Sequence, residues 1–522
     1  MSLAAGCASA VRHKANATHR DVSRGDIMSQ EIINMEDEVM SSKAIRTRFA
    51  PSPTGFMHIG NLRTALYAYL LAKSTGGQFI VRIEDTDQVR LVEGAVDVIL
   101  KTLEMTKLDY DEGPVVGGPN GPYIQSERKE IYKKYAEELV QKGHAYYCFC
   151  SQERLQQLHD ENGVGGYDRH CRDLSQEEIN QKLQAGEPYV IRQKIPLTGV
   201  TSYYDEVFGE ISTENKEMQD QILLKADGYP TYNFAHVIDD HLMNVTHVVR
   251  GSEYLTSTPK YVLLYDAFGW ERPHYVHLPL LMGQNEDGKV SKLSKRHGAV
   301  SFQDLVNMGY LPAAIVNYIA LLGWCPKDTN KEVFSLDELK ENFSIEGINK
   351  SPSVFDYEKL KWFNSEYIKM MSQDEFAEKT EPMLKEICPA NVDTRKLANL
   401  LHTRVSTLNE VTDMTGFIVS RLPMEGDLYT NKKNKTTPEL CRQILEEVKP
   451  LLEGCSDWDN DTLFELLKGY ASESGRKVGA VMWAVRIAVA RQAVTPGGAT
   501  ELMEVLGKEE SLGRITQAIE EL

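Results

Sequence analysis

Residues 44–87 alternate between extended and helical patterns, and this order restricts the fold more than any other feature of the chain. Ile45, Thr47 and Phe49 alternate with two arginines, which is typical of a strand. Apolar residues then recur along one face of a helix until Gly76-Gly77, and a second strand is expected at residues 79–83. A strand–helix–strand unit this short predicts a parallel sheet covered by helices. The apolar helix positions are Leu62, Ala65, Leu66, Tyr69 and Leu70.

A second α/β region is expected at residues 245–281, and the chain after Ser372 is expected to be helical. Strands are predicted at 245–249 and 275–281, with a helix between them that begins at Thr258-Pro259 and ends at Gly269. In the last part, Leu397, Leu400 and Leu401 share one helix face, as do Val478, Val481 and Met482. A chain of 522 residues exceeds what one hydrophobic core usually serves, so two or more domains are expected.

Two further parts of the chain differ from these α/β and helical regions: the segment between the two α/β regions, and the first 43 residues. A helix is predicted at 127–143, a cysteine-containing loop-rich stretch at 146–172, and a capping box from Ser175 to Glu178. Residues 1–43 show no core-forming period and are interpreted as a disordered tail or a wrongly assigned start, with Met28 and Met35 as other starts. An organelle transit peptide is the alternative, although such peptides are poor in acidic residues.

Residues 51–61 form a proline- and glycine-rich turn between the first strand and the helix. Gly55 and Gly60 lack side chains that would keep a phosphate from the backbone, and the helix start directs its amides at the same place. His58 can donate a hydrogen bond to phosphate oxygens. The alternative is an ordinary turn with an exposed histidine.

Residues 289–298 form a second candidate segment, with four cations within eight residues. A loop of this kind can fold over a triphosphate and neutralise its charge. The alternative is a solvated basic loop. Both segments are expected at the carboxyl ends of parallel strands, where open α/β sheets bind ligands.

Taken together, the two segments resemble the signature motifs of class I aminoacyl-tRNA synthetases. His-Ile-Gly-Asn at 58–61 is similar to their His-x-Gly-His motif, with Asn61 in place of the second histidine, and Lys-Leu-Ser-Lys-Arg at 292–296 is similar to Lys-Met-Ser-Lys-Ser. Longer strings at 48–55, 82–87, 227–232 and 237–243 resemble the bacterial-type glutamyl-tRNA synthetases. This resemblance extends over residues 44–522.

The resemblance implies an α/β Rossmann-like catalytic domain with an inserted acceptor-stem-binding domain, followed by an all-α anticodon-binding region. The implied boundaries are 44–137 and 224–282 for the two catalytic halves, 138–223 for the insertion, 283–371 for the Lys-Leu-Ser-Lys-Arg loop and stem-contact region, and 372–522 for the helical region.

The resemblance also implies a two-step reaction. Glutamate attacks the α-phosphate of ATP, bound with Mg²⁺, and the glutamyl-adenylate then passes its acyl group to the terminal adenosine of a tRNA. Such chemistry needs positioning and charge neutralisation more than a protein nucleophile. The implied catalytic residues are His58, Lys292 and Lys295, and the implied ATP-binding residues are Thr54, His58, Gly60, Asn61, Ser294 and Lys295.

By the same resemblance, Arg48 and Arg250 grip the substrate carboxylates, while Ser52 and Glu84 surround the α-amino group. Tyr232 lines the glutamate pocket, and His236 is also assigned to glutamate binding, at a position that varies within the family. Without the resemblance, an arginine at a strand end would usually be interpreted as the partner of a surface acid.

Some members of the family hold a structural zinc ion through a Cys-x-Cys and a later Cys-x-His pair. The corresponding residues are Cys148, Cys150, Cys171 and Asp173, with His170 as a substitute for Asp173. The alternative is a set of ordinary buried thiols. A second grouping of acidic and histidine residues, His236, Asp239, Asp240 and His241, is interpreted as polar residues near a helix end and not as a metal site.

Composition limits the classes of protein to which this chain can belong. A formal charge of −18, from 58 basic and 76 acidic residues, argues against a chain coated in basic residues but permits a local basic groove. Scattered cysteines predict a reducing cytoplasm, and no apolar run approaches the ~18 residues of a membrane span. The resemblance implies L-glutamate, ATP and tRNA(Glu) as partners, tRNA(Gln) as a second candidate, and a monomer.

Two rival functions remain open to comparison. One is the shortened relative that glutamylates a modified tRNA base, which lacks the helical part expected here after Ser372. The other is a catalytically inactive tRNA-binding paralogue, which the intact His58, Lys292 and Lys295 disfavour.

Overall fold

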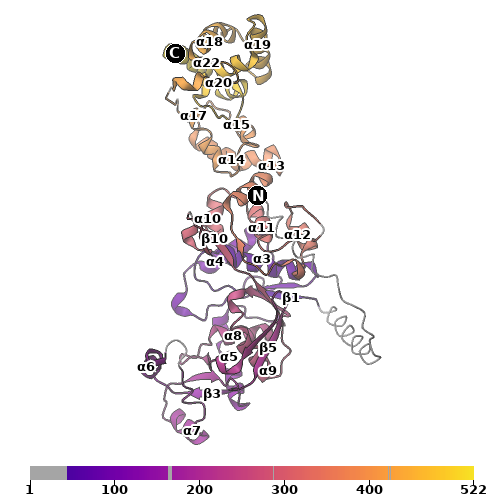
Figure 1. Ribbon diagram of the computed structural model, residues 1–522, viewed down its shortest axis with the longest axis vertical. Coiled ribbons are helices and arrows are strands. Elements are labelled where there is room, and N and C mark those ends of the chain that lie inside the picture. The colour runs from indigo at the N-terminus through magenta and orange to yellow at the C-terminus, as the bar shows by residue number, and fades with distance from the viewer. Residues whose placement is uncertain (1–43, 163–166, 286, 328, 421, 424) are drawn as a thin grey trace, which may run out of the picture. The chain divides into compact units, whose positions relative to one another are not determined.

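The computed structural model describes residues 44–162, 167–285, 287–327, 329–420, 422–423 and 425–522 (Figure 1). The tail expected at 1–43 lies outside these residues. The chain divides into two compact units. The described part of the first comprises residues 44–304 and Val316–Asp356, and the second comprises Leu305–Ile315 and Tyr357–Leu522.

The predicted strand–helix–strand unit is confirmed. Strands β1 (Arg46–Phe49) and β2 (Gln78–Val81) pair in parallel, and helix α3 (Ile59–Ser74) connects them in the sequence. The helix is buried almost all round instead of along one face, because it is covered on more than one side. Thr47 Oγ1 donates to Ala68 O at 2.7 Å, and Tyr67 OH donates to Leu322 O at 3.0 Å.

A four-stranded sheet in the order β6–β5–β9–β8 lies next to the β1–β2 pair. Its β5–β9 and β8–β9 pairs are parallel, and β5–β6 is an antiparallel hairpin. Thr246 N, just before β8, donates to Arg46 O at 2.9 Å, so β1 lies beside the start of β8. The elements are β5 (Val200–Asp205), β6 (Gly209–Glu214), α8 (Tyr232–Leu242), β8 (His247–Gly251), α9 (Thr258–Phe268) and β9 (His274–Leu278).

The predicted helix from Thr258 to Gly269 is confirmed, with Gly269 in the left-handed conformation as its cap. The strand expected to run to Leu281 ends earlier, at Leu278. Pro279 follows, and because proline has no backbone N–H it cannot continue the ladder. The chain then enters a small sheet made of β10 (Leu281–Gln284), β11 (Val290–Lys292) and β12 (Ser353–Val354).

The segment between the two α/β regions forms its own antiparallel sheet in the order β3–β4–β7. The capping box predicted at Ser175 is present and opens α7. This segment and the rest of the first unit contain α4 (Ala95–Met105), α5 (Lys129–Gln141), β3 (Ala145–Cys148), α6 (Gln152–Asn162), α7 (Gln176–Gln184), β4 (Val190–Gln193), β7 (Ile222–Leu224) and α12 (Leu336–Asn342), while α10 (Phe302–Asn307) and α11 (Pro312–Ala320) cross the unit boundaries.

The second unit is helical, as predicted, around a core that includes Leu397, Leu401 and Val481 (Figure 1). Val478, expected on the buried face, is 38% exposed because it is the first residue of its helix. No helix in the described parts of either unit is long and apolar enough to cross a membrane. The helices are α13 (Tyr357–Met370), α14 (Gln373–Ile387), α15 (Thr394–Leu401), α16 (Glu410–Asp413), α17 (Gly416–Val419), α18 (Pro438–Glu453), α19 (Asn460–Glu473), α20 (Val478–Ala490), α21 (Ala499–Leu506) and α22 (Lys508–Glu521).

Candidate active site

A cavity of about 590 Å³ opens where β1 and β8 end, beside the start of α3 and the turn after β11. Glu84 and His236 are not among the described residues that line it, and the side chain of Lys295 lies outside the described part of the chain. The predicted residues that do line it are Arg48, Ser52, Thr54, His58, Gly60, Asn61, Tyr232, Arg250, Lys292 and Ser294.

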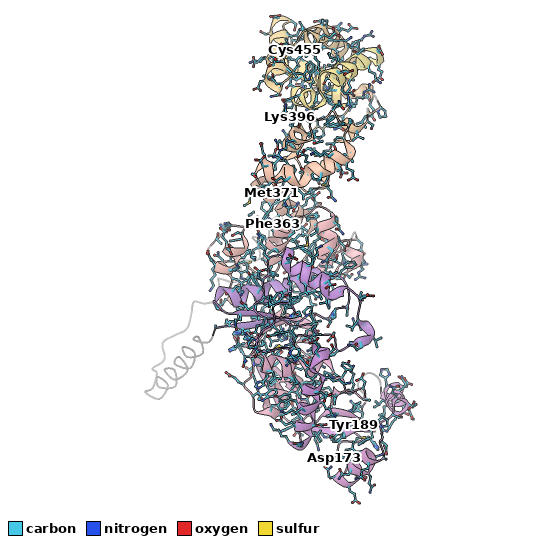
Figure 2. The ribbon with its side chains drawn as sticks, turned by 180° about the vertical axis from the view of Figure 1, so that it is seen from behind. Asp173, Tyr189, Phe363, Met371, Lys396 and Cys455 are labelled. Carbon is cyan, nitrogen blue, oxygen red and sulfur yellow. The ribbon has the colours of Figure 1, made fainter. Side chains whose placement is uncertain are left out.

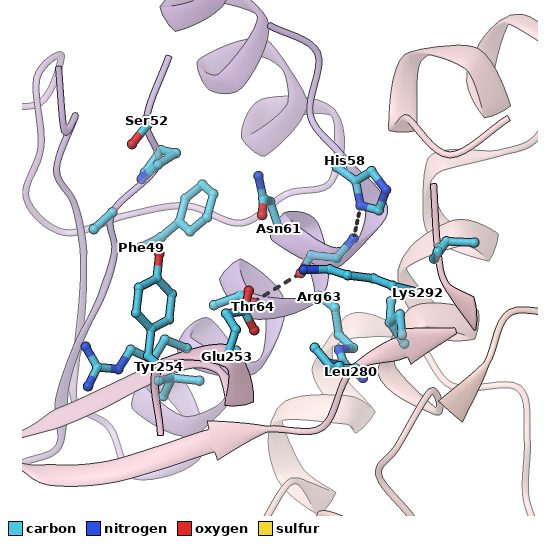
Figure 3. A pocket seen from close by; sticks show the side chains of 18 of the residues that line it. Phe49, Ser52, His58, Asn61, Arg63, Thr64, Glu253, Tyr254, Leu280 and Lys292 are labelled. Carbon is cyan, nitrogen blue, oxygen red and sulfur yellow. Dashed lines mark hydrogen bonds between the residues drawn. The ribbon is translucent and has the colours of Figure 1, made fainter. Parts of the chain in front are cut away.

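His58 caps the start of α3 and faces the cavity (Figure 3). Its Nδ1 accepts a hydrogen bond from Gly60 N at 3.0 Å, which leaves Nε2–H as the free donor of a neutral imidazole. Burial, followed by the positive charge of Lys292, lowers the pKa of His58 and favours that neutral form. A Cβ atom at Gly60 would lie 3.3 Å from His58 Nδ1, so a glycine there leaves room for the imidazole.

Backbone hydrogen bonds join the first motif segment to residues 300–302, which follow the second motif segment and lie more than 200 residues away in sequence. Ile59 N donates to Val300 O at 2.9 Å, and Phe302 N donates to Met57 O at 3.0 Å. His58 and Ser301 form an antiparallel bridge. The residues that follow the basic turn are therefore held against the start of α3 by main-chain bonds.

His297 organises the basic turn, a role that sequence reasoning did not assign. Ser294 N donates to its Nδ1 at 3.1 Å, and its Nε2 lies 3.1 Å from Ser291 Oγ. The ring packs on Gly283, where a Cβ atom would come within 2.6 Å of it. The only signal for this role in the sequence is a histidine that directly follows the run of cations.

Behind the cavity, three arginines and three carboxylates form a buried ion-pair network: Arg48, Arg82, Arg128, Glu84, Asp239 and Asp240. Arg48 Nε lies 3.0 Å and Arg82 Nη1 2.8 Å from the same oxygen of Asp240. Burial alone would raise the pKa of the Asp240 carboxyl, but Arg48 and Arg82 outweigh it and lower that pKa. Asp239 and Asp240 are thus partners of arginines.

Glu84 and His236 lie within or against this network. Glu84 accepts a hydrogen bond from Arg82 Nη2 at 2.9 Å, and burial raises the pKa of Glu84 to about 6 although Arg82 opposes it. His236 packs edge-on against Tyr261 at a ring distance of 4.4 Å, and neither ring nitrogen has a hydrogen-bond partner among the described residues. Burial lowers the pKa of His236 to about 4.

Arg250 lies at the end of β8 among aromatic rings. Its guanidinium carbon is 4.8 Å from the centre of the Tyr261 ring and 5.1 Å from that of Tyr254. Its Nη1 is buried without a hydrogen-bond partner in the described part of the chain. An arginine with an unpaired buried donor is suited to a carboxylate ligand.

The three cysteines of the inserted segment form a close group, with all Sγ atoms within 4.8 Å of one another. The structure does not bring Asp173, which is labelled in Figure 2, into this group. Its side chain is 86% exposed and faces Lys194 at 3.5 Å. His170 is also exposed. The oxygen beside the group belongs to Tyr167, whose OH lies 3.2 Å from Cys148 Sγ.

Comparison with known proteins identifies the class. Residues 44–362 match the family described as "tRNA synthetases class I (E and Q), catalytic domain", and residues 375–519 match "Anticodon binding domain". The chain therefore belongs to the class I aminoacyl-tRNA synthetases, as the Rossmann-like fold and its two motifs indicate.

Individual relatives narrow the class to the glutamate–tRNA ligases, the family to which this chain belongs. It is 55% identical to the glutamate–tRNA ligase of Clostridium botulinum (strain Hall) over 482 residues, which cover 92% of this chain and 98% of that protein. It is 54% identical to that of Clostridium novyi (strain NT), covering 92% and 99%. The structure of a glutamate tRNA ligase from Elizabethkingia meningosepticum in complex with its amino acid aligns with a TM-score of 0.83 at 36% identity, covering 92% and 99%.

Proposed function

We propose that this chain activates L-glutamate with ATP to glutamyl-adenylate and pyrophosphate, and then transfers glutamate to the 3′-terminal adenosine of tRNA(Glu). The observation that supports this proposal is the composition of one cavity. Its lining combines the buried guanidinium groups of Arg48 and Arg250 with the phosphate-directed His58 and Lys292. An amino acid and a triphosphate would thus have complementary groups in the same site.

In the first step a glutamate α-carboxylate oxygen attacks the α-phosphorus, and the bond to pyrophosphate breaks. The negative charge that develops on the phosphate oxygens is met by His58 Nε2–H, by the positive end of the α3 helix dipole, and by Lys292 and Lys295. Mg²⁺, when bound with ATP, neutralises part of the triphosphate charge. In the second step a ribose hydroxyl of the tRNA attacks the carbonyl carbon and AMP leaves.

The test is ATP–pyrophosphate exchange with glutamate and tRNA(Glu) present, in the wild type and in Lys295→Ala. We expect exchange that requires glutamate, and a rate in the variant lower by about ten- to a thousandfold, the range for one preorganised charge contact. Lys289→Ala, outside the motif and with a side chain 82% exposed, is the matched control. Glutamate-independent exchange, or equal rates in both variants, would contradict the proposal.

Several finer properties belong to the same proposal. Both tRNA(Glu) and tRNA(Gln) are proposed as candidate acceptors, and charging each purified tRNA separately decides between one acceptor and two. The proposed enzyme works as a monomer in the cytoplasm. Its sedimentation coefficient at micromolar concentration tests the first of these properties, and cell fractionation tests the second.

Zinc is proposed as a structural ion held by Cys148, Cys150 and Cys171. The donor set fits, because three thiolates at this spacing are typical zinc ligands and Phe149 N already donates to Cys171 Sγ at 3.4 Å. The Tyr167 oxygen and the Asp173 carboxylate compete for the fourth position. Tyr167 is favoured by its place against Cys148.

Elemental analysis of protein purified without chelator tests the ion. We expect one zinc per chain, little zinc in Cys150→Ser, and a larger loss in Tyr167→Phe than in Asp173→Ala. Cys325→Ser, outside the group, is the control. A zinc-free wild type would leave the three cysteines as ordinary thiols.

A further inference from the structure

Three buried side chains on neighbouring strands form a hydrogen-bonded row beside the cavity. Asp205 ends β5, His277 lies in β9 and Arg250 lies in β8, and the sheet order β5–β9–β8 places them next to one another. Arg250 and His277 are direct cross-strand partners. Asp205 and His277 are both fully buried, and neither is among the described residues that line the cavity.

Asp205 accepts backbone hydrogen bonds on both of its carboxylate oxygens. Its Oδ1 accepts from Val207 N at 3.0 Å and from Phe208 N at 2.8 Å, and its Oδ2 accepts from His277 N at 3.2 Å. A carboxylate oxygen accepts hydrogen bonds and donates none. The 2.6 Å contact between Asp205 Oδ2 and His277 Nδ1 therefore requires a proton on Nδ1.

This proton fixes the tautomer of His277. With Nδ1 as the donor, Nε2 of the neutral imidazole carries a lone pair, which accepts a hydrogen bond from Arg250 Nε at 3.1 Å. A doubly protonated ring would face the Nε–H of Arg250 with another N–H and place two cations side by side. Burial lowers the pKa of His277, with Arg250 acting in the same direction and Asp205 opposing it, in agreement with the neutral ring.

The other anchor of Arg250 is Thr258, the first residue of α9. Arg250 Nη2 donates to Thr258 Oγ1 at 2.6 Å, and Thr258 Oγ1 donates to Tyr254 O at 2.8 Å. Two of the three guanidinium nitrogens are thereby fixed, while Nη1 has no hydrogen-bond partner among the described residues. The remaining donor can turn only as far as these anchors allow.

We propose that Asp205 and His277 are positioning residues that hold the Arg250 guanidinium in the orientation in which it binds the carboxylate of the amino-acid substrate. This inference rests on the proposed role of Arg250 in glutamate binding. It adds a fixed chain of three groups, from carboxylate to imidazole to guanidinium, in which each member sets the orientation of the next. Holding a charged donor in place before the substrate arrives reduces the entropy that binding must overcome.

The test compares His277→Leu with His277→Gln in ATP–pyrophosphate exchange with tRNA present. Leucine removes the acceptor for Arg250 Nε, whereas the glutamine side chain offers both a donor for Asp205 and an acceptor for Arg250. We expect KM for glutamate to rise about ten- to hundredfold in His277→Leu, the usual effect of one lost hydrogen bond to a charged group. KM for ATP should stay within about twofold, and His277→Gln should recover most of the loss.

Arg250→Leu, alone and combined with His277→Leu, separates positioning from a merely structural role. If His277 acts through Arg250, the double variant should have the same KM for glutamate as Arg250→Leu. His247→Leu is the matched control, because His247 lies on β8 but its ring stacks on His274, away from this row. His277→Met is a second apolar variant, should leucine prevent folding.

Four outcomes would overturn the inference: an unchanged KM for glutamate in His277→Leu, equal rises for glutamate and ATP, no recovery with glutamine, or additive effects in the double variant. Arg250→Leu with a normal KM for glutamate would instead overturn the role proposed for Arg250 itself. A defective Arg250→Leu beside a normal His277→Leu would overturn the positioning chain alone.

Discussion

The two arginines of the cavity have different electrostatic surroundings. Arg48 shares the Asp240 carboxylate with Arg82, whereas Arg250 contacts aromatic rings, an imidazole and a hydroxyl group. Part of the charge of Arg48 is thus compensated within the described protein. Both nevertheless reach the cavity. A substrate carboxylate in the cavity would face one arginine that is paired with a carboxylate and one that has no carboxylate partner among the described residues.

Selectivity for glutamate over glutamine must be electrostatic, since the two side chains are nearly isosteric. A carboxylate offers a guanidinium two acceptor oxygens, whereas an amide offers only one. A buried guanidinium left half-paired costs on the order of 2–3 kcal/mol of binding free energy. We expect Arg48→Leu to depress glutamate activation far more than it changes KM for ATP, and to bring the glutamate-to-glutamine activation ratio toward unity. Exchange kinetics with both amino acids measure this ratio, with Arg48→Lys as the control. A preserved preference would assign the discrimination elsewhere.

His236 predicts a pH dependence of stability. Burial lowers its pKa to about 4 in the folded protein, below the ordinary value of 6.5, so the unfolded chain binds the extra proton between these values. Its contribution to stability is therefore complete above about pH 6.5 and is lost as the pH falls toward 4. We expect the wild type to lose more free energy of unfolding than His236→Gln between pH 7 and pH 5. Urea unfolding at both pH values measures the difference, and parallel losses would show that His236 does not contribute.

At the level of secondary structure, the end of α3 depends on two glycines with different constraints. Gly76 has a φ of +66° with open space where a Cβ atom would lie, whereas a Cβ atom at Gly77 would lie 1.8 Å from Ile45 O. The first is a matter of backbone conformation. At Gly77 the constraint is steric, because the turn lies close to the residue that precedes β1.

This contrast gives a matched pair of substitutions. We expect Gly76→Ala to cost about 1 kcal/mol, the strain of a left-handed alanine. Gly77→Ala should cost about 3 kcal/mol or more, because β1 must move to admit the methyl group. Denaturant unfolding of both variants tests the order. A smaller cost at position 77 than at 76 would mean that the strand shifts with little resistance.

At the scale of the molecule, each of the two units contains its own hydrophobic core. Tyr132, Phe234 and Leu264 belong to a core of the first unit, and Leu445 and Leu467 belong to that of the second. Two cores favour unfolding in more than one step. The cavity proposed to bind ATP and glutamate lies within the first unit.

We therefore expect calorimetry to resolve two transitions. Glutamate with a non-hydrolysable ATP analogue should stabilise only the first unit. At ligand concentrations a hundred times Kd, its free energy of unfolding should rise by about 2.7 kcal/mol. Leu445→Ala should lower only the free energy of unfolding of the second unit, by about 2–5 kcal/mol, the cost of a cavity in a packed core. A single transition that moves as a whole under both changes would contradict independent unfolding.

The sequence by itself determined the local elements and the motifs. The strand–helix–strand unit, the helix ended by Gly269, the capping box at Ser175 and the helical last part all follow from periodicity and capping chemistry, which act over a few residues. Most residues assigned to the site by the motifs, including Arg48, do line the cavity. These features could be predicted because each depends on neighbours in the chain.

The tertiary structure decided which side chains meet. Arg48 and Asp240 are 192 positions apart, and His277 and Asp205 are 72 apart, so no local pattern shows that they pair. For the same reason the sequence did not show that Glu84 and His236 lie within or against the buried ion-pair network, and sequence reasoning overlooked His297. Partners of buried charges are selected by the three-dimensional packing of strands and helices, because desolvation makes an unpaired buried charge costly wherever its partner lies in the sequence.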